Sequence, residues 1–316
     1  AIGFGMPAVT MYAALRGYSE ALGHPRPVTV ISLAALVLLV PLNFVFMYGF
    51  GPIPALGSAG CGFATAILQW IMFFTLATYI FKASAYQKTQ VFSTWEKMDR
   101  YWIERILKLG LPIGLAIFFE VRICSAAAII LSPLGETIVA AHQIAMSVTS
   151  QLFMIPMSLA IALTIRVGTY YGEKNWEAMR KVQKLGLATG TILALMTMLL
   201  IALFRPEIVA IYTSDHEVSE VAMYLLLFAL AYQLMDAWQI SAAGCLRGMQ
   251  DTKGPMWITM VAYWIVAFPV SIYLARYTNI GAAGVWIGLI VGLSVACALL
   301  LLRLYNNNKR LSQDYP

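Results

Sequence analysis

The chain has 316 residues, of which 60% are hydrophobic and 11% charged, and its 21 Lys and Arg against 15 Asp and Glu give a formal net charge of +6. Soluble domains average about 45–50% apolar and about 25% charged residues, so this composition excludes an ordinary soluble protein and indicates a membrane protein. No stretch has the short alternating pattern of a transmembrane barrel, so we expect an all-α, polytopic helix bundle.

Apolar runs long enough to cross a bilayer, which takes about 20 residues per helix, recur along the whole chain. Residues 1–15 have no initiator Met and no basic segment, so they do not resemble a signal peptide and are expected to be the end of a helix whose start is missing. Eight complete spans are then expected at residues 28–49, 58–81, 106–131, 137–165, 185–204, 217–246, 256–275 and 281–303.

Basic residues in short loops set the orientation of a multispanning protein. Of the 21 Lys and Arg, 18 lie on alternate loops and the C-terminal tail. The loops of opposite parity hold only Arg205 and Arg276, and Arg122 lies inside a span. We therefore expect the basic side and the C-terminus to be cytoplasmic. Because the charges are spread over separate membrane-flanking segments, we expect no nucleic-acid partner.

An internal repeat links two parts of the chain. ALRGYSEALGHPRP at residues 14–27 resembles CLRGMQDTKGP at residues 245–255, and the spans that follow share a proline, Pro41 and Pro269. Six spans separate the two loops, so the repeats run parallel, as in the paired halves of many transporters. The alternative is coincidence among Gly- and Pro-rich loops. If each half has six helices, we expect the first three and most of the fourth to be absent here.

This repeat predicts the domain organisation. Residues 1–81 are expected to be the remainder of an N-terminal lobe, 82–105 a cytoplasmic linker, 106–304 a C-terminal lobe and 305–316 a cytoplasmic tail.

Three charged residues lie deep in spans, namely Glu120, Arg122 and Asp236. A charge at mid-membrane costs at least about 2.5–3.5 kcal/mol on insertion scales, so each needs a reason. Tyr232 precedes Asp236 by one helical turn and Gln239 follows it by nearly one, which predicts an oxygen-rich stripe suited to a hard monovalent cation or a proton. Glu120 could supply a second carboxylate, whereas Arg122 points to the opposite side of its helix. The alternative is a buried polar contact that only holds helices together.

The segments FFEVRI, VAAHQIAMS, FMIPMSLAIALTIRVGTYYGE and LLLFALAYQLMDAWQISAAGCLRG together resemble the multidrug and toxic compound extrusion transporters of the bacterial NorM-like branch. The resemblance covers nearly the whole chain, from the end of the family's fourth helix to its twelfth. It implies two pseudo-symmetric six-helix lobes that carry organic cations and antibiotics out in exchange for Na⁺ or H⁺.

The resemblance also implies the site. A cation site would use Glu120, Tyr232 and Asp236, with Phe153 as a wall, and Glu120 and Asp236 would be the ligands of a Na⁺ ion. Asp215 is a candidate substrate contact, against the alternative of an ordinary solvated loop charge.

Further expectations follow from the resemblance. No cofactor is expected apart from the coupling ion, Na⁺ or H⁺, and the chain is not expected to be an enzyme. It is expected to be a monomer in the bacterial inner membrane. Arg122 departs from the family pattern, and its charge could tune the carboxylate site. Because the absent helices include the first, which carries another functional Asp in the family, this chain alone is not expected to transport.

Other functions remain open on the sequence. A lipid-linked oligosaccharide flippase of the same superfamily would need a cavity rich in Arg or Lys. An intramembrane enzyme could use Glu120 and Asp236 as paired acids, but the GxGD and DxxxD signatures of such enzymes do not occur. A receptor or scaffold would tolerate neutralisation of both carboxylates.

Overall fold

The computed structural model describes residues 2–50, 54–86, 99–278 and 280–314. The chain divides into two compact units, Ala1–Met98 and Asp99–Pro316. In the first unit, a short 3₁₀ turn (η1, Ile2–Gly5) leads into α1 (Met6–Ala21), and α3 (Ser58–Lys82) packs against both α1 and α2 (Arg26–Tyr48). A second 3₁₀ turn, η2 (Ser84–Tyr86), follows α3.

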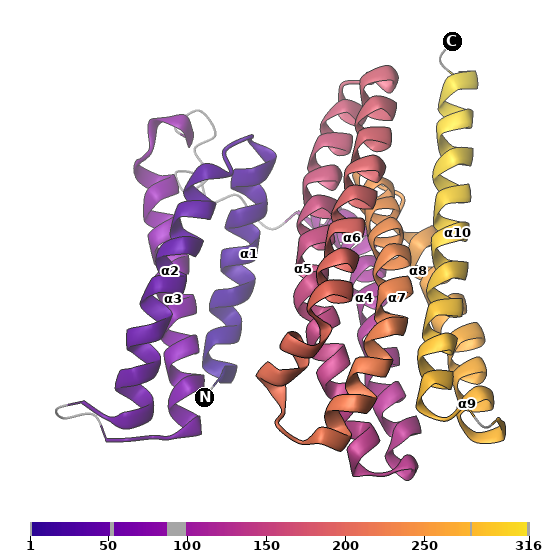
Figure 1. Cartoon of the computed structure of the whole chain (residues 1–316). Coiled ribbons are helices and arrows are strands. Elements are labelled where there is room, and N and C mark those ends of the chain that lie inside the picture. The colour runs from indigo at the N-terminus through magenta and orange to yellow at the C-terminus, as the bar shows by residue number, and fades with distance from the viewer. Residues whose placement is uncertain (1, 51–53, 87–98, 279, 315–316) are drawn as a thin grey trace. The chain divides into compact units, whose positions relative to one another are not determined.

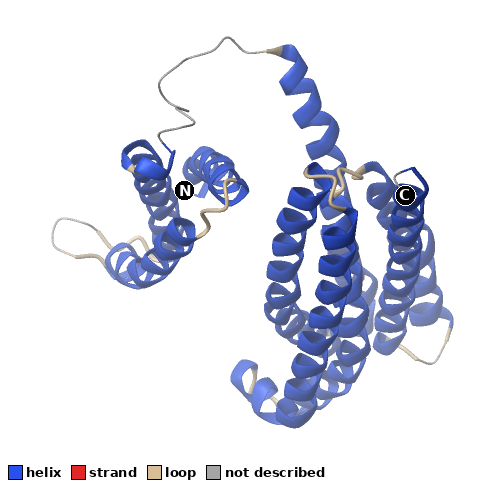
Figure 2. Ribbon diagram, turned by 90° about the horizontal axis from the view of Figure 1, so that it is seen from above, coloured by secondary structure: helices blue, strands red, loops and turns tan. Residues whose placement is uncertain are grey.

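The second unit is a helix bundle (Figures 1 and 2). Its elements are α4 (Arg100–Leu131), η3 (Ser132–Leu134), α5 (Glu136–Gly172), α6 (Trp176–Tyr212), α7 (His216–Gly248), α8 (Lys253–Met260), η4 (Val261–Ala267), α9 (Phe268–Tyr277) and α10 (Ala282–Asp314).

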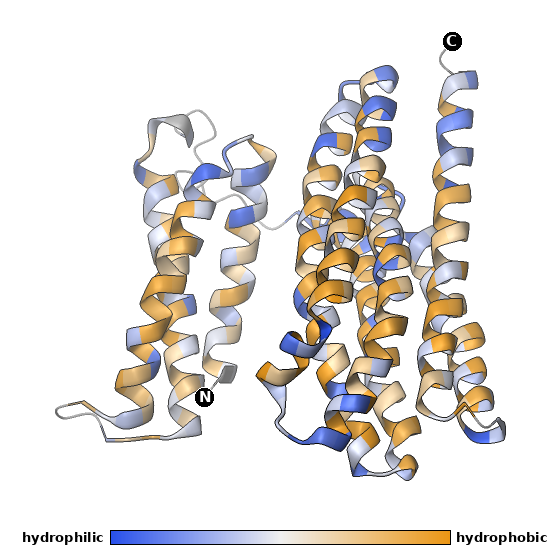
Figure 3. Cartoon of the chain, in the orientation of Figure 1, coloured by the Kyte–Doolittle hydropathy of each residue, from blue (hydrophilic) through white to orange (hydrophobic). Residues whose placement is uncertain are grey.

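Eight helical segments of the described chain are long and apolar enough to cross a membrane, with α8, η4 and α9 counting as one. Figure 3 shows hydrophobic residues along the middle of the helices and hydrophilic residues gathered at their ends. Large apolar side chains such as Leu185, Ile192, Leu195 and Leu199 are exposed on α6, as expected for a surface that faces lipid. The predicted all-α membrane bundle with eight spans is confirmed.

Several helices are longer than the predicted spans. The helix α5 continues to Gly172 rather than ending near residue 165, and α10 continues to Asp314 rather than 303. The apolar pattern detects only the stretch that crosses the membrane, whereas polar residues can extend a helix beyond it. The helix α6 continues past a kink at Phe204, two residues before Pro206, whose ring disturbs the preceding turn.

The span after the second LRG loop contains a π-helical segment, η4, between α8 and α9. Pro269 lies at the start of α9 and cannot donate a backbone hydrogen bond, and π-helical turns are a usual way for a helix to accommodate such an irregularity. The corresponding Pro41 lies inside α2, which is α-helical throughout.

The second half of α7 is buried on nearly all sides, from Asp236 to Gly248. Small residues allow this, because a Cβ atom added at Gly244 would lie 2.6 Å from the carbonyl oxygen of Ala160 on α5. The hydroxyl of Thr164 on α5 donates a hydrogen bond of 3.0 Å to the carbonyl oxygen of Gly244. Close backbone approach of this kind is how helices associate in membranes, and it fixes α7 against α5.

Replacing Gly244 by Ala should therefore destabilise the protein. Overpacking of a tight contact typically costs about 1–3 kcal/mol. Gly110→Ala is the matched control, because nothing lies within 4 Å of a Cβ at that helical position, and Ala is favoured over Gly in a helix interior. Thermal unfolding in detergent should show a lower midpoint for Gly244→Ala only, and equal midpoints for both variants would contradict the close α5–α7 contact.

Candidate functional site

A cavity of about 250 Å³ lies between α4, α5 and α7. Its lining contains Glu120 from α4, Phe153 from α5, and Tyr232 and Asp236 from α7. Three separate helices thus bring the four residues of the predicted cation site into one cavity. The four-residue spacing of Tyr232 and Asp236 places both on one face of α7.

The two carboxylates are shielded from solvent to different degrees, and Asp236 is almost wholly buried. Asp236 is 1% exposed, and its Oδ1 atom has no hydrogen-bond partner among the described atoms. Glu120 is half-buried, and the two carboxylates are close enough to interact electrostatically. Buried charges in proteins are normally paired or bound to ions, so this cavity is chemically suited to a cation or a proton.

Aromatic packing holds the phenol at this cavity. The ring of Tyr232 lies edge-on to that of Trp286 on α10, with centroids 6.1 Å apart. His142 contacts the same indole at 5.9 Å and is 1% exposed. It does not line the cavity. His142 and Tyr232 therefore both pack against Trp286, but of these two only Tyr232 lines the cavity.

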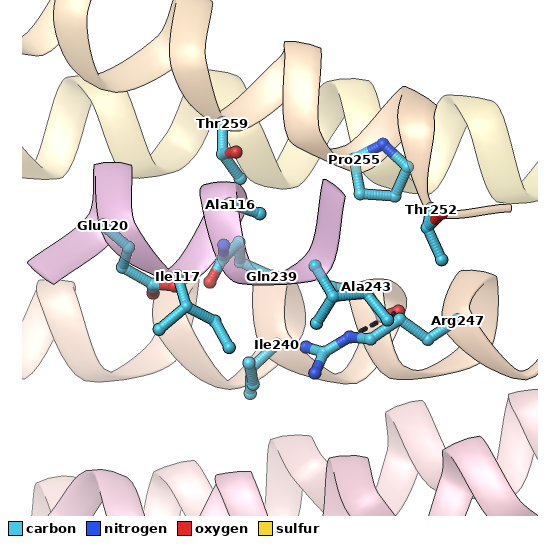
Figure 4. A pocket seen from close by; sticks show the side chains of 11 residues that line it. Ala116, Ile117, Glu120, Gln239, Ile240, Ala243, Arg247, Thr252, Pro255 and Thr259 are labelled. Carbon is cyan, nitrogen blue, oxygen red and sulfur yellow. Dashed lines mark hydrogen bonds between the residues drawn. The ribbon is translucent and has the colours of Figure 1, made fainter. Parts of the chain in front are cut away.

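A second, smaller pocket of about 30 Å³ lies beside the first, between α4, α7 and α8 (Figure 4). Glu120 and Arg247 line both cavities. Gln239 lines only the smaller one, so the predicted stripe of Tyr232, Asp236 and Gln239 is divided between two cavities. Thr252 and Thr259 complete its polar lining.

Arg247 is a site residue that the sequence analysis placed among the loop charges. Its side chain runs back along α7, where Nε donates a 3.3 Å hydrogen bond to the carbonyl oxygen of Ala243 (Figure 4). The guanidinium and Glu120 interact electrostatically. Helical periodicity could have found it, since 11 residues at about 100° per residue return Arg247 to nearly the same face as Asp236.

The two LRG loops use their arginines differently. In the first unit, Nε of Arg16 pairs with Glu20 at 2.7 Å, four residues later. The corresponding acid after Arg247 is Asp251, whose Oδ2 atom instead accepts a hydrogen bond of 2.6 Å from Nε of Arg303 on α10. Asp251 is thus bound to Arg303 on α10 rather than to Arg247, and Arg247 lines both cavities.

Asp251 lies in the loop between α7 and α8. Burial disfavours its charged form, but hydrogen bonds from Arg303 and Asn307 outweigh burial and hold the pKa of Asp251 below its usual value. The contact therefore stabilises the fold above the unfolded-state pKa of an Asp. That stability is lost as the pH falls through the lower folded-state pKa.

Arg122 does not lie at either cavity. Its side chain is exposed, and its guanidinium lies 5.2 Å from the centroid of the Phe118 ring on the same helix. The structure thus does not bring Arg122 to the carboxylates, and Arg247 is instead the arginine that lines both cavities. The reason is helical geometry, because two residues turn Arg122 by about 200° away from Glu120.

Asp215 lies at the other end of α7. Its Oδ1 atom accepts hydrogen bonds from the backbone N–H groups of Glu217 at 2.9 Å and Val218 at 3.3 Å, so it caps the helix. At about 1.5 Å per residue it is roughly 30 Å along the helix from Asp236. The structure does not bring Asp215 to the cavity.

The donor set of the cavity is oxygen-rich. Among the described residues, no group of three or more His, Cys, Asp and Glu side chains could hold a metal ion. Two carboxylates and a phenol instead fit a hard monovalent cation or a proton that binds and leaves as a substrate.

Comparison with known proteins shows which relatives share this sequence. The MatE family model matches residues 112–273, which include every residue of the cavity described above. A probable multidrug resistance protein NorM of Acinetobacter baylyi is 76% identical over 99% of this chain and 70% of its own length. The multidrug resistance protein NorM of Vibrio cholerae is 41% identical over 96% of this chain and 68% of its own length.

Solved structures show the same fold. A eukaryotic MATE transporter superposes with a TM-score of 0.86 at 21% identity, over 98% of this chain and 70% of that one. An outward-facing multidrug resistance MATE transporter superposes with a TM-score of 0.82 at 20% identity, over 96% of this chain and 66% of that one. The chain belongs to the MATE family, the multidrug and toxic compound extrusion transporters, in its NorM-like branch.

Proposed function

We propose that the cavity between α4, α5 and α7 is the coupling-ion site of a multidrug antiporter, which exchanges organic cations outward for Na⁺ or H⁺ inward. The relatives' description as multidrug resistance proteins supports the transport of drugs. The observation that carries the ion coupling is the convergence of Glu120 and Asp236 on one cavity.

The chemistry of exchange follows from charge compensation. Two carboxylates with apolar walls require positive charge nearby, and Na⁺, a proton or an organic cation can each supply it. Their binding is therefore mutually exclusive or strongly antagonistic, as antiport requires. Met146 and Met157 also line the cavity, and flexible thioether side chains suit walls that repack around varied apolar ligands.

Ion binding must favour one conformation to drive transport. In the proposed mechanism, an ion at Glu120 and Asp236 draws α4 and α7 together, while the close α5–α7 contact transmits the change to the rest of the bundle. Residues 106–304 would act as one lobe and residues 1–81 as part of the other, joined by 82–105. The two lobes then rock to open the cavity alternately, with the basic loops on the cytoplasmic side.

Arg247 would act as a tethered cation in this cycle. It lines both cavities with Glu120, so its guanidinium can compensate that carboxylate when neither an ion nor a drug is bound. Such compensation would stabilise the cavity when neither an ion nor a drug neutralises its carboxylates. The phosphorylated substrate of a flippase would need several cations, whereas this cavity has two carboxylates for one guanidinium.

Asp236→Asn should abolish gradient-driven efflux of a fluorescent organic cation from proteoliposomes. The variant removes the buried charge while keeping the side chain's size. The chain would be tested at the full length of its relatives, with Na⁺ and H⁺ gradients imposed separately, and the gradient that drives efflux identifies the ion.

Asp215→Asn is the matched control, because it makes the same change on the same helix and Asn caps helices as well as Asp. Its gradient-driven efflux should continue. A folded Asp236→Asn protein that still responds to the gradients would contradict the proposed site.

Arg303→Gln should free Asp251 to pair with Arg247, as Glu20 pairs with Arg16. The new pair withdraws the Arg247 guanidinium, which competes with organic cations, from Glu120. Organic cations should then bind more tightly, by at least about fivefold, the lower end of typical coupling between two binding events. Equilibrium binding of the drug measures the change. Adding Asp251→Asn to Arg303→Gln should reverse it, and equal affinities in the single and double variants would contradict the role of Arg247.

A further inference from the structure

A groove of about 480 Å³ lies between the beginning of α6 and the end of α10. Two side-chain hydrogen bonds tie these helix ends together. Nη1 of Arg180 donates to Oγ of Ser312 at 2.6 Å, and Nδ2 of Asn308 donates to Oε1 of Gln183 at 2.7 Å. We call this feature the α6–α10 groove. It is separate from the carboxylate cavities, with which it shares no residue.

The α6 wall of the groove is graded from charged to apolar. Arg180 lies one turn inside the helix start, Lys184 follows it, and Leu187 comes next. At about 1.5 Å per residue, these positions span roughly 10 Å along the helix. The wall thus presents two cations at the membrane surface and an aliphatic side chain deeper in the bilayer.

The α10 wall repeats this order. Lys309, Tyr305 and Leu301 are spaced by four residues, so they share one face of the helix. Because α10 ends where α6 begins, Lys309 lies at the same end of the groove as Arg180. Tyr305 is exposed at an intermediate depth, which is where Tyr is enriched at membrane interfaces.

The cations of the groove have no acidic partner among the side chains that the structure describes. The four ion pairs among the described residues involve none of Arg180, Lys184 and Lys309. Glu177 lies in the first turn of α6 but does not line the groove. Lys184 and Lys309 are both exposed. Three positive charges therefore lie beside an apolar surface, and none of them is ion-paired with a described acidic side chain.

We propose that the α6–α10 groove binds an anionic phospholipid of the cytoplasmic leaflet. Basic pockets between membrane helices on that side are suited to anionic head groups. The phosphodiester would lie among the three cations, and an acyl chain would follow Leu301 and Leu187 into the bilayer. The order of cations, aromatic ring and aliphatic side chains on both walls matches the order of groups along a phospholipid. A soluble phosphate would use only the cationic end.

Native mass spectrometry of the full chain in neutral detergent tests this, with phosphatidylglycerol as the probe and phosphatidylcholine as the uncharged comparison. The double variant Lys184→Gln with Lys309→Gln should bind phosphatidylglycerol roughly 25-fold more weakly, at about fivefold for each cation removed. Lys181→Gln with Lys253→Gln removes the same charge from the same side, outside the groove, and should bind as the wild type does. Lys184→Arg with Lys309→Arg should retain the lipid.

Three results would overturn the proposal. The first is equal weakening by the groove and control variants, which would indicate general attraction by the basic side. The second is equal retention of phosphatidylcholine and phosphatidylglycerol by the wild type. The third is binding of glycerol phosphate, which has no acyl chains, as tightly as the lipid. Unchanged thermal unfolding of the Gln variant without lipid confirms that the surface substitutions leave the fold intact.

Discussion

Charge compensation inside an apolar helix bundle is the constraint on which the rest of this molecule depends. Asp236 is almost wholly buried, and one of its oxygens has no partner among the described atoms. Glu120 reaches the same cavity from another helix. An uncompensated charge at mid-membrane is costly, so such a pair favours any state that brings positive charge to it. In the proposed mechanism, the competing sources of that charge are the coupling ion, the drug and Arg247, and their competition is the basis of exchange.

The packing of α7 is what places these groups together. Its small residues let the helix lie against the backbone of α5, and Asp236 on this buried part of α7 lines the cavity between them. At the end of the same helix, Arg303 on α10 holds Asp251 and leaves Arg247 extended toward Glu120. The corresponding arginine of the first unit is instead paired with its neighbour Glu20. Two copies of one loop motif thus hold their arginines differently, because Arg303 on a distant helix binds the acid that corresponds to Glu20.

Much of this could be predicted from the sequence, for identifiable physical reasons. The apolar runs gave the spans because the bilayer sets their length. The cost of buried charge singled out Glu120 and Asp236, which line the cavity, but also Arg122, which is exposed. Phe153 entered only through the family resemblance. The full lengths of α5 and α10 were missed because polar helix ends leave no apolar pattern. Arg247 was counted as a loop charge because it falls one residue past the predicted span 217–246, although helical periodicity places it on nearly the same face as Asp236.

The most direct test of the central claim is to measure what leaves the site when a drug binds. Purified protein at the full length of its relatives would be titrated with an organic cation at equilibrium, while released protons and Na⁺ are followed in weakly buffered detergent solution. Competition at one pair of carboxylates predicts that drug binding releases one of these ions, and that Glu120→Gln with Asp236→Asn abolishes the release. Drug binding by the wild type without release of either ion would contradict the account.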